Sequence, residues 1–227
     1  MESFTGAVAF LLRMLGDTAH VLSMVVLVQK ILKTRSASGL SFKTQLLKLI
    51  VFATRYLDIF NLQFFRPIHF YNFLMKILYL TFQSVLIYII KFKMYSTYEP
   101  LLDDFKIEFL LLPSFLLSIF FSRKDFSVSE IFYNFSVILE SLVIVPQLVQ
   151  LQKMQESETL TSRYIFLLGA YRLCYTLSWF VIKLGSIRRV NDLMFACGII
   201  QTALYVHFFF LFYGYVFKGK GFKRIPK

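Results

Sequence analysis

The sequence predicts an all-α integral membrane protein with seven transmembrane helices. Hydrophobic residues make up 57% of the chain and the mean hydropathy is +0.64, whereas soluble domains contain about 45–50% apolar residues. The apolar residues also occur in long runs, of the roughly 17–25 residues that an α-helix needs to cross a bilayer. We therefore expect residues 1–227 to form a single seven-helix membrane domain, with 218–227 as a basic cytoplasmic tail.

Seven apolar runs can be placed along the chain. They span residues 7–29, 45–62, 68–91, 106–121, 128–150, 162–183 and 192–217. The first run contains charged residues and lacks a small-residue cleavage site, so we interpret it as a permanent span and not as a signal peptide. The fourth run is short and is expected to be broken by Pro113. Lys48 and Lys76 lie nearer the ends of the second and third runs, and we expect their side chains to extend to the membrane interface.

The positive charges indicate the orientation in the membrane. Lys and Arg are most frequent in the segments 30–35 and 91–93 and in the tail 218–227, which share one side when the N-terminus is lumenal. Cytoplasmic loops carry an excess of these residues. The net charge of +12 would suggest nucleic-acid binding in a soluble chain, but here it predicts a lumenal N-terminus and a cytoplasmic C-terminus.

The cysteine and histidine residues do not indicate a disulfide, a metal site or another cofactor. Cys174 and Cys197 both lie inside apolar runs, and the three His residues are scattered without metal-ligand spacing.

Two short segments suggest an internal repeat. ASGLS (37–41) precedes the second run, whose centre contains ATRY (53–56), and SETLT (157–161) precedes the sixth run, whose centre contains AYRL (170–173). Repeats of this kind occur in membrane carriers. They predict two parallel three-helix units joined by the fourth span.

Four of the predicted spans carry ionisable or polar side chains along one stripe each. On a helix with about 100° per residue, each stripe covers an arc of about 60–100°. The stripes consist of Arg13, Asp17 and His20 in the first run, Arg55 and Asp58 in the second, Glu130, Tyr133, Glu140 and Gln147 in the fifth, and Tyr171, Arg172, Tyr175 and Trp179 in the sixth. A charge that faces lipid is costly, so we predict that the stripes face a shared interior cavity.

The charges in these stripes have two interpretations. In the first, each Arg pairs with a carboxylate, and the pairs only hold the helices together. In the second, the stripes form a binding site, because ionisable residues inside membranes are usually functional. Since the planar guanidinium of Arg binds both oxygens of a carboxylate, such a site would favour a small, multiply anionic ligand.

His20 is a candidate pH switch. An imidazole has an ordinary pKa of about 6.5, so mild acid would add one positive charge and favour anion binding. The alternative for a single His on a span is a neutral, hydrogen-bonded packing residue. The sequence alone leaves both interpretations open.

Several segments resemble the ER lumen protein-retaining (KDEL) receptor family over nearly the whole chain. They include RMLGDTAHVLS (13–23), FATRYLDIF (52–60), SEIFYNFSVILESLVIVPQL (129–148) and ESETLTSRYIFLLGAYRLCYTLSW (156–179). The resemblance implies two parallel three-helix bundles joined by a linker helix, similar to PQ-loop proteins such as the SWEET sugar carriers, with Pro146-Gln147 as the PQ motif.

The same resemblance implies a receptor and not an enzyme. Such a receptor binds the C-terminal Lys-Asp-Glu-Leu or His-Asp-Glu-Leu tetrapeptide of soluble ER proteins in the mildly acidic Golgi. It returns them to the endoplasmic reticulum in coat-protein-I (COPI) vesicles and releases them at neutral pH.

Matching positions imply roles for individual side chains. Arg55, assisted by Tyr56, would bind the terminal carboxylate of the ligand, and Arg13 would bind an acidic side chain. The residue four from the C-terminus would be recognised by Asp58, Glu130 and Tyr133.

The remaining matched positions are implied to sense protons and to line the site. Glu140, Tyr171 and Arg172 would form a polar network coupled to His20, the proton sensor. The wall of the site would be completed by Tyr175 and Trp179.

The chain departs from the family pattern at three places. Tyr133 stands where the family has a tryptophan, and His207 stands where it has an acidic residue. A family arginine aligns with Ile182, next to Lys183. Either Lys183 substitutes as a point charge, or one cation of the site is missing.

The basic tail and the overall function each keep an alternative. Lys218 and Lys220 are candidates for a COPI-binding site, or they are ordinary positive charge on the cytoplasmic side.

The alternative to a receptor is a proton-coupled carrier of a small anionic solute. A third possible function is that of a structural membrane subunit.

Overall fold

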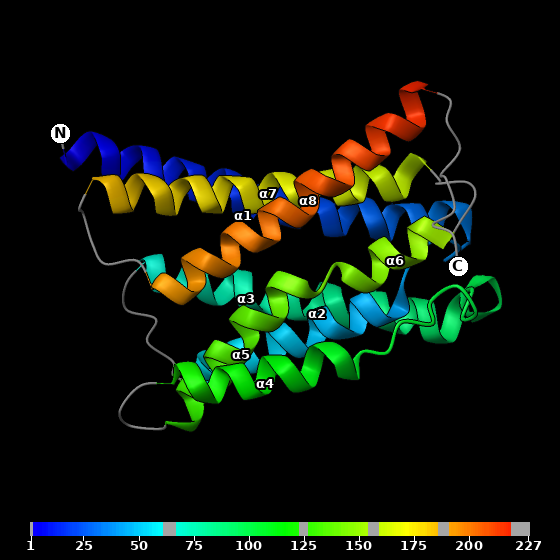
Figure 1. Ribbon diagram of the computed structural model, residues 1–227, viewed down its shortest axis with the longest axis horizontal. Coiled ribbons are helices and arrows are strands. Elements are labelled where there is room, and N and C mark those ends of the chain that lie inside the picture. The colour runs from blue at the N-terminus through cyan, green and yellow to red at the C-terminus, as the bar shows by residue number, and fades with distance from the viewer. Residues whose placement is uncertain (1, 61–66, 123–126, 154–158, 186–190, 219–227) are drawn as a thin grey trace. The chain divides into compact units, whose positions relative to one another are not determined.

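The computed structural model describes residues 2–60, 67–122, 127–153, 159–185 and 191–218. The described residues form helices and connecting turns without any strand, so the prediction of an all-α protein is confirmed. The α-helices shown in Figure 1 are α1 (Glu2–Thr34), α2 (Phe42–Arg55), α3 (Pro67–Tyr88), α4 (Glu108–Phe121), α5 (Val128–Leu142), α6 (Val145–Lys153), α7 (Thr159–Leu184) and α8 (Asp192–Lys218). Short 3-10 helices span Leu57–Phe60 and Tyr95–Thr97, and a π-helix spans Ile89–Lys93.

The helices follow the seven predicted runs, but two proline effects differ from the expectation. The run 128–150 is divided, because α5 ends at Leu142 and α6 begins at Val145. Pro146 explains this break, since proline lacks an N–H and its ring clashes with the carbonyl four residues earlier. The prediction that Pro113 breaks the fourth run is wrong, because α4 continues through it and the loss is confined to one backbone hydrogen bond.

Three of the described helical segments are long and apolar enough to cross a membrane. They are Phe4–Thr34, His69–Lys93 and Val128–Lys153. The helices α2 and α4 have 14 residues each, fewer than the roughly 17 that a bilayer requires. After α2 the backbone tightens, because the Ile59 N–H bonds to the Tyr56 carbonyl at 3.0 Å. The second predicted run therefore consists of α2 followed by a 3-10 turn.

The chain forms two compact units, which are described separately. Unit 1 comprises residues 1–35 and 150–227, and unit 2 comprises residues 36–149. In unit 1, α1 and α7 lie side by side and α8 packs against α7 (Figure 1). In unit 2, α2 packs against α3 and α5, and α4 packs against α5.

Small and hydroxylated residues allow close packing in unit 1. Ser178 Oγ of α7 donates to the Ala9 carbonyl of α1 at 2.8 Å. On α8, a Cβ added to Gly198 would lie only 2.6 Å from the ring of Trp179. Small residues at such contacts let membrane helices approach closely, so Gly198 sets how near α8 lies to the indole.

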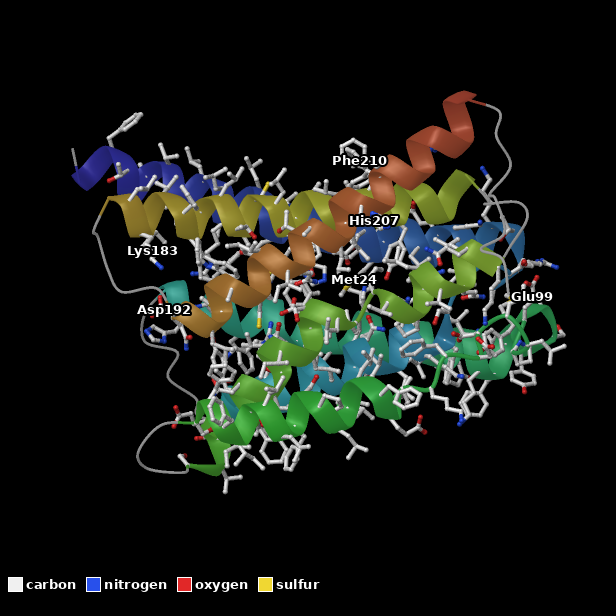
Figure 2. The ribbon with its side chains drawn as sticks, in the orientation of Figure 1. Met24, Glu99, Lys183, Asp192, His207 and Phe210 are labelled. Carbon is white, nitrogen blue, oxygen red and sulfur yellow. The ribbon has the colours of Figure 1, made fainter. Side chains whose placement is uncertain are left out.

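At the ends of α7 and α8, Lys183 and Asp192 form an exposed ion pair. Lys183 Nζ lies 3.3 Å from Asp192 Oδ1, and Figure 2 labels both side chains. The neighbouring Ile182 is buried. The position that aligns with the family arginine is thus apolar and buried, while Lys183 pairs with Asp192 at the helix ends.

In unit 2, Gln147 fixes the start of α2 against α6. Its Oε1 accepts the Ser41 N–H at 2.9 Å, and its Nε2 donates to the Gly39 carbonyl at 2.9 Å. Its own backbone N–H donates to Thr44 Oγ1 at 3.0 Å. The PQ motif thus sets the register of α2 along α5 and α6.

Asp103 links the connection after α3 to the start of α2. Its buried carboxylate accepts from Ser41 Oγ at 2.8 Å, from the Lys43 N–H at 3.1 Å and from Tyr98 Oη at 2.7 Å. Burial raises the pKa of the Tyr98 hydroxyl above its ordinary value, and the hydrogen bond to Asp103 adds to this effect. This loop is therefore held to the start of α2 by hydrogen bonds to the Asp103 side chain, one of them from the Tyr98 hydroxyl.

Candidate functional site

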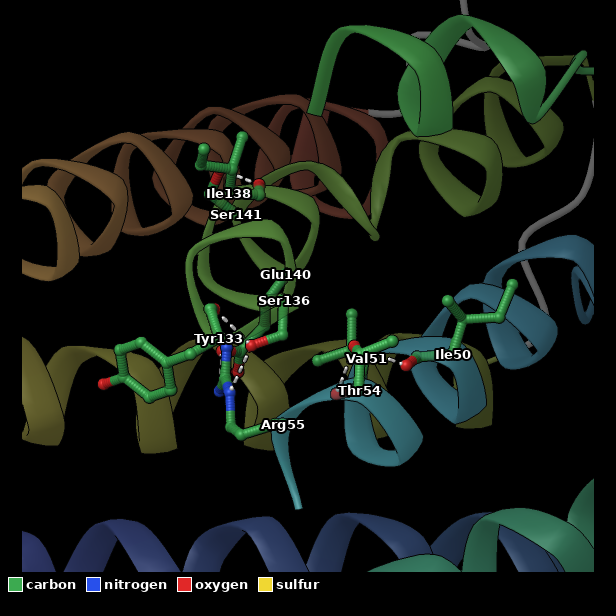
Figure 3. Close-up of polar contacts among 9 residues, drawn as sticks. All are labelled: Ile50, Val51, Thr54, Arg55, Tyr133, Ser136, Ile138, Glu140 and Ser141. Atoms are coloured by element: carbon green, nitrogen blue, oxygen red, sulfur yellow. Dashed lines mark hydrogen bonds and ion pairs between the residues drawn. The ribbon is translucent and has the colours of Figure 1, made fainter. Parts of the chain in front are cut away.

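Arg55, the last residue of α2, contacts two residues of α5 (Figure 3). Its Nη1 forms an ion pair with Glu140 Oε2, and its Nε donates to Ser136 Oγ at 3.1 Å. Its Nη2 is buried and has no hydrogen-bond partner among the described residues. Two guanidinium nitrogens are thus engaged, and the third can donate to an additional acceptor. We call Arg55, Ser136 and Glu140 the Arg55 cluster.

The register of the helices explains this meeting. Ser136 and Glu140 lie four residues apart, on one face of α5. Arg55 follows Thr44 by 55 − 44 = 11 residues, and Ser136 precedes Gln147 by 147 − 136 = 11 residues. Because α2 and α5 run antiparallel, the contact between Thr44 and Gln147 brings Arg55 opposite Ser136. The pairing of an arginine with a carboxylate, left open by the sequence, occurs here.

Tyr56 and Asp58 lie immediately after α2, where Lys76 of α3 meets both. Lys76 Nζ is 2.7 Å from Asp58 Oδ2 and 5.8 Å from the ring centroid of Tyr56. The Tyr56 ring also stacks on Phe52, with 5.8 Å between the centroids. Lys76 thus pairs with a carboxylate of the same unit, and the expectation that its side chain extends to the membrane interface stays a prediction.

Lys48 also differs from the expectation. Its side chain is only 6% exposed, although it was expected to reach the membrane interface. Lys48 precedes Arg55 by seven residues, so that both lie within about 20° of each other around the helix axis. It therefore belongs to the buried face of α2 that packs inside the protein.

Glu130 and Tyr133 lie in the first two turns of α5. The Tyr133 carbonyl accepts from Ser136 Oγ at 2.6 Å, which ties its backbone to the Arg55 cluster. Its ring is 37% exposed and is drawn beside Arg55 in Figure 3. Tyr133 thus lies next to the Arg55 cluster along α5, and Glu130 lies three residues nearer the start of the helix.

In unit 1, α1 and α7 bring together a carboxylate, a tyrosine and a tryptophan. Tyr175 Oη donates to Asp17 Oδ1. The Tyr175 ring stacks on Trp179, with 6.2 Å between the centroids and 14° between the planes. The Arg172 guanidinium lies 5.0 Å from the Trp179 ring centroid, a cation–π geometry. Three of the four residues of the stripe predicted on the sixth run, Arg172, Tyr175 and Trp179, are therefore in contact with one another through the Trp179 ring.

His20 of α1 stacks on Tyr171 of α7. The ring centroids are 4.1 Å apart and the planes differ by 6°, and both side chains are buried, at 5% and 3% exposed. Tyr171 in turn meets Tyr175 edge-on, at 5.7 Å between centroids. The stack fixes the imidazole of α1 against the ring face of a tyrosine of α7.

We call these unit 1 residues the Tyr175 cluster. Its members are Asp17, His20, Tyr171, Arg172, Tyr175 and Trp179. Arg13 lies on α1 one turn before Asp17 and is half-buried. Within each unit the predicted stripes meet, α1 with α7 and α2 with α5. The prediction of one cavity shared by all four stripes stays a prediction.

Sequence reasoning missed Ser136 and Lys76. Ser136 lies one turn before Glu140 on the same face of α5. This spacing could have identified Ser136 as a neighbour of Glu140, which pairs with Arg55. Lys76 lies three and seven residues before Tyr79 and Gln83, which face α2. This helical spacing marked the packed face of α3, and it could have identified Lys76 as a residue on the side of α3 that packs against α2.

The predicted tail site lies at the edge of the described chain. Lys218 is the last residue of α8, and Lys220 lies outside the described residues. In the described part of the chain, no group of three or more His, Cys, Asp or Glu residues could hold a metal ion.

Comparison with known proteins places these features in one family. The sequence model of the family described as ER lumen protein retaining receptor matches residues 36–182. This match includes the Arg55 cluster, the PQ motif and the α7 residues of the Tyr175 cluster.

Curated relatives extend the similarity to α1. The ER lumen protein-retaining receptor of Drosophila melanogaster is 40% identical over 208 residues, which cover 92% of this chain and 95% of the relative. ER lumen protein-retaining receptor 2 of Homo sapiens is 43% identical over 209 residues, covering 92% and 95%. ER lumen protein-retaining receptor 3 of Xenopus laevis is 39% identical over 208 residues, covering 92% and 94%.

Proposed function

Because the chain belongs to the ER lumen protein retaining receptor family, we propose that it binds the C-terminal retention tetrapeptide of lumenal proteins. The ligands would end in Lys-Asp-Glu-Leu, His-Asp-Glu-Leu or a close variant. Such a peptide carries two acidic side chains and a free terminal carboxylate, so an arginine-lined site suits it. The receptor would act by binding and transport, without a catalytic step.

The observation that carries the proposal is the state of Arg55. Glu140 and Ser136 engage two of its guanidinium nitrogens, while the buried Nη2 has no partner among the described residues. A buried donor without an acceptor is unfavourable. An incoming carboxylate would satisfy Nη2 and would compete with Glu140 for the same guanidinium. We therefore assign the terminal carboxylate to Arg55, with Tyr56 assisting.

The other assignments follow the chemistry of the ligand. Arg13 would bind an acidic side chain of the tetrapeptide. The basic residue four from the end would be recognised by Asp58, Glu130 and Tyr133. The walls and the polar network would be formed by Glu140, Tyr171, Arg172, Tyr175 and Trp179.

His20 would make binding dependent on pH. An unperturbed imidazole gains a proton as the pH falls below about 6.5, and a positive charge added at His20 would favour a ligand with net negative charge. Affinity should therefore be highest in mildly acidic compartments and lower at neutral pH. The stack on Tyr171 supports this role, because the ring face stabilises a cation.

The proposed setting is the membrane of the endoplasmic reticulum and the Golgi. The distribution of Lys and Arg supports a lumenal N-terminus and a cytoplasmic C-terminus. The repeated segments before the second and sixth spans support two parallel three-helix bundles joined by the fourth span, as in PQ-loop proteins. Lys218 and Lys220 would contact the COPI coat on the cytoplasmic side.

The proposal can be tested by peptide binding to the purified receptor. A fluorescent peptide ending in Lys-Asp-Glu-Leu should bind more tightly at about pH 6 than at about pH 7.5. The same peptide with an amidated C-terminus should lose binding at both values. Equal affinity of the acid and the amide would contradict the assignment of Arg55, and failure of all Asp-Glu-Leu peptides to bind would contradict the proposed function.

A further inference from the structure

The carboxylate of Asp58 is paired with a cation of the receptor itself. Lys76 Nζ lies 2.7 Å from Asp58 Oδ2, which is the geometry of a charge-assisted hydrogen bond. The proposed function assigns Asp58 to the basic residue of the tetrapeptide. An internal ammonium therefore occupies the carboxylate that the ammonium or imidazolium of the ligand would need.

The packing of α3 on α2 holds Lys76 at this position. Tyr79, one turn after Lys76, stacks on Phe52 with 5.7 Å between the ring centroids. A further turn on, Gln83 Nε2 donates to both the backbone carbonyl and the side-chain Oε1 of Gln45, at 2.8 and 3.0 Å. These two contacts anchor α3, so that Lys76 is presented at the end of α2. The pair with Asp58 is thus a consequence of the helix register.

The pair is also accessible enough to be exchanged. The side chain of Lys76 is 23% exposed and that of Asp58 is 60% exposed. Ion pairs of this exposure are weak, because water solvates both partners after separation. The nearby Tyr56 ring, 5.8 Å from Lys76 Nζ, offers the ammonium a second contact when the carboxylate is taken.

We propose that Lys76 is an internal competitor for the basic residue of the tetrapeptide and thereby sets how strongly the receptor discriminates at that position. This inference rests on the proposed function. A ligand with Lys or His four residues from its end exchanges one cation for another at Asp58, so it gains little over a ligand with a neutral residue there. Without Lys76, the Asp58 carboxylate would have no ammonium to exchange. A basic residue of the ligand would then gain the full free energy of pairing with Asp58.

The test compares two peptides on three forms of the full-length receptor. The peptides end in Lys-Asp-Glu-Leu and Ala-Asp-Glu-Leu, and binding is measured at one mildly acidic pH. Lys76→Met removes the ammonium and keeps a flexible apolar side chain of similar length, whereas Lys76→Arg keeps the competing charge. Lys183→Met is the matched control, since it breaks another exposed lysine–aspartate pair.

Lys76→Met should raise the affinity ratio of the Lys peptide to the Ala peptide by about fivefold, the range of an exposed ion pair. The ratio should stay unchanged in Lys76→Arg and in Lys183→Met. An unchanged ratio in Lys76→Met would overturn the inference. So would an equal loss of affinity for both peptides, which would assign Lys76 to an acidic group of the ligand.

The outcome also separates this inference from the proposed function. If the unchanged receptor binds both peptides but Lys76→Met leaves their ratio unaltered, only the role of Lys76 is wrong. If the unchanged receptor binds neither peptide, the proposed function is wrong and the role of Lys76 is wrong with it.

Discussion

The Arg55 cluster and the Tyr175 cluster use different interactions to hold polar groups between helices. In unit 2, α2 and α5 are joined by an ion pair and a hydroxyl hydrogen bond on one guanidinium. In unit 1, α1 and α7 are joined by ring stacking, with one carboxylate that accepts a tyrosine hydroxyl. The first arrangement fixes charges against each other, whereas the second leaves the faces of aromatic rings next to ionisable groups.

The difference suggests that the two clusters have different roles in ligand binding. A guanidinium with one unengaged nitrogen is suited to exchange one carboxylate for another. A stacked imidazole is suited to gain or lose a proton without moving its neighbours, since the ring shape is unchanged. We therefore expect substitution of Arg55 to alter affinity for the terminal carboxylate, and substitution of His20 to alter the pH dependence of affinity.

The largest effect is expected when the charge pair of unit 2 is broken from one side. Arg55→Ala removes the guanidinium from the Glu140 carboxylate, which should lower the free energy of unfolding by about 3–5 kcal/mol. The double variant Arg55→Ala with Glu140→Gln should recover most of this loss, because the side chain that faced the guanidinium is then neutral. Thermal unfolding in detergent, followed by intrinsic fluorescence, measures both. Equal losses in the single and the double variant would show that the pair itself does not determine the stability.

A packing change should disturb unit 1 without altering any charge. Gly198→Ala places a Cβ 2.6 Å from the Trp179 ring, so the indole or α8 must shift, at a cost of about 1–3 kcal/mol. The variant should unfold at a lower temperature, and its tryptophan fluorescence should change because Trp179 is the chain's single tryptophan.

Gly6→Ala is the control for this variant, because a Cβ at Gly6 meets nothing within 4 Å. It should behave like the unchanged protein. If Gly198→Ala leaves both the unfolding temperature and the fluorescence unaltered, the close contact of α8 with the indole does not exist in solution.

The proton-dependent part of binding should depend on unit 1. His20→Phe keeps a ring against Tyr171 but removes the titratable nitrogens. The increase in peptide affinity between about pH 7.5 and pH 6, which we expect to be at most roughly tenfold for one added positive charge, should disappear. His207→Phe changes an exposed imidazole on α8 and should keep the increase. A retained pH dependence in His20→Phe would exclude His20 as the sensor.

The smallest effect is expected outside both clusters, in the loop after α3. Tyr98→Phe removes the 2.7 Å hydrogen bond to Asp103 and should lower the stability by about 1 kcal/mol. Because the folded state raises the pKa of Tyr98, its stabilising contribution is complete below the ordinary tyrosine pKa of about 10 and declines at higher pH. The stability of Tyr98→Phe should therefore fall less steeply in alkaline unfolding experiments. A parallel decline in both proteins would argue against this bond.

Much of the helical organisation was predictable from the sequence, because apolar runs and polar stripes report directly on helix length and on buried faces. The break between α5 and α6 was not predicted, since the apolar run continues through Pro146 and only the backbone chemistry of proline interrupts it. Pro113 shows the opposite case, in which one lost hydrogen bond does not end a helix.

Within the candidate site, the stripes identified the residues but not their partners. The spacing placed Arg55 on a polar face, but its pairing with Glu140 depends on the register that Gln147 sets between distant segments. Lys76 was given no role because a lysine in an apolar run fits both a membrane interface and an ion pair. Its partner carboxylate, Asp58, lies on a different helix and could be found only from tertiary structure.

The most direct test of the central claim is a thermodynamic cycle between Arg55 and the terminal carboxylate of the peptide. Affinities of the free-acid and amidated Lys-Asp-Glu-Leu peptides are measured for the unchanged receptor and for Arg55→Ala with Glu140→Gln, at one mildly acidic pH. The account predicts that amidation costs at least about a hundredfold in the unchanged receptor, the range of a buried charged hydrogen bond, and almost nothing in the double variant. An equal cost of amidation in both proteins would contradict it, because the carboxylate would then be bound elsewhere.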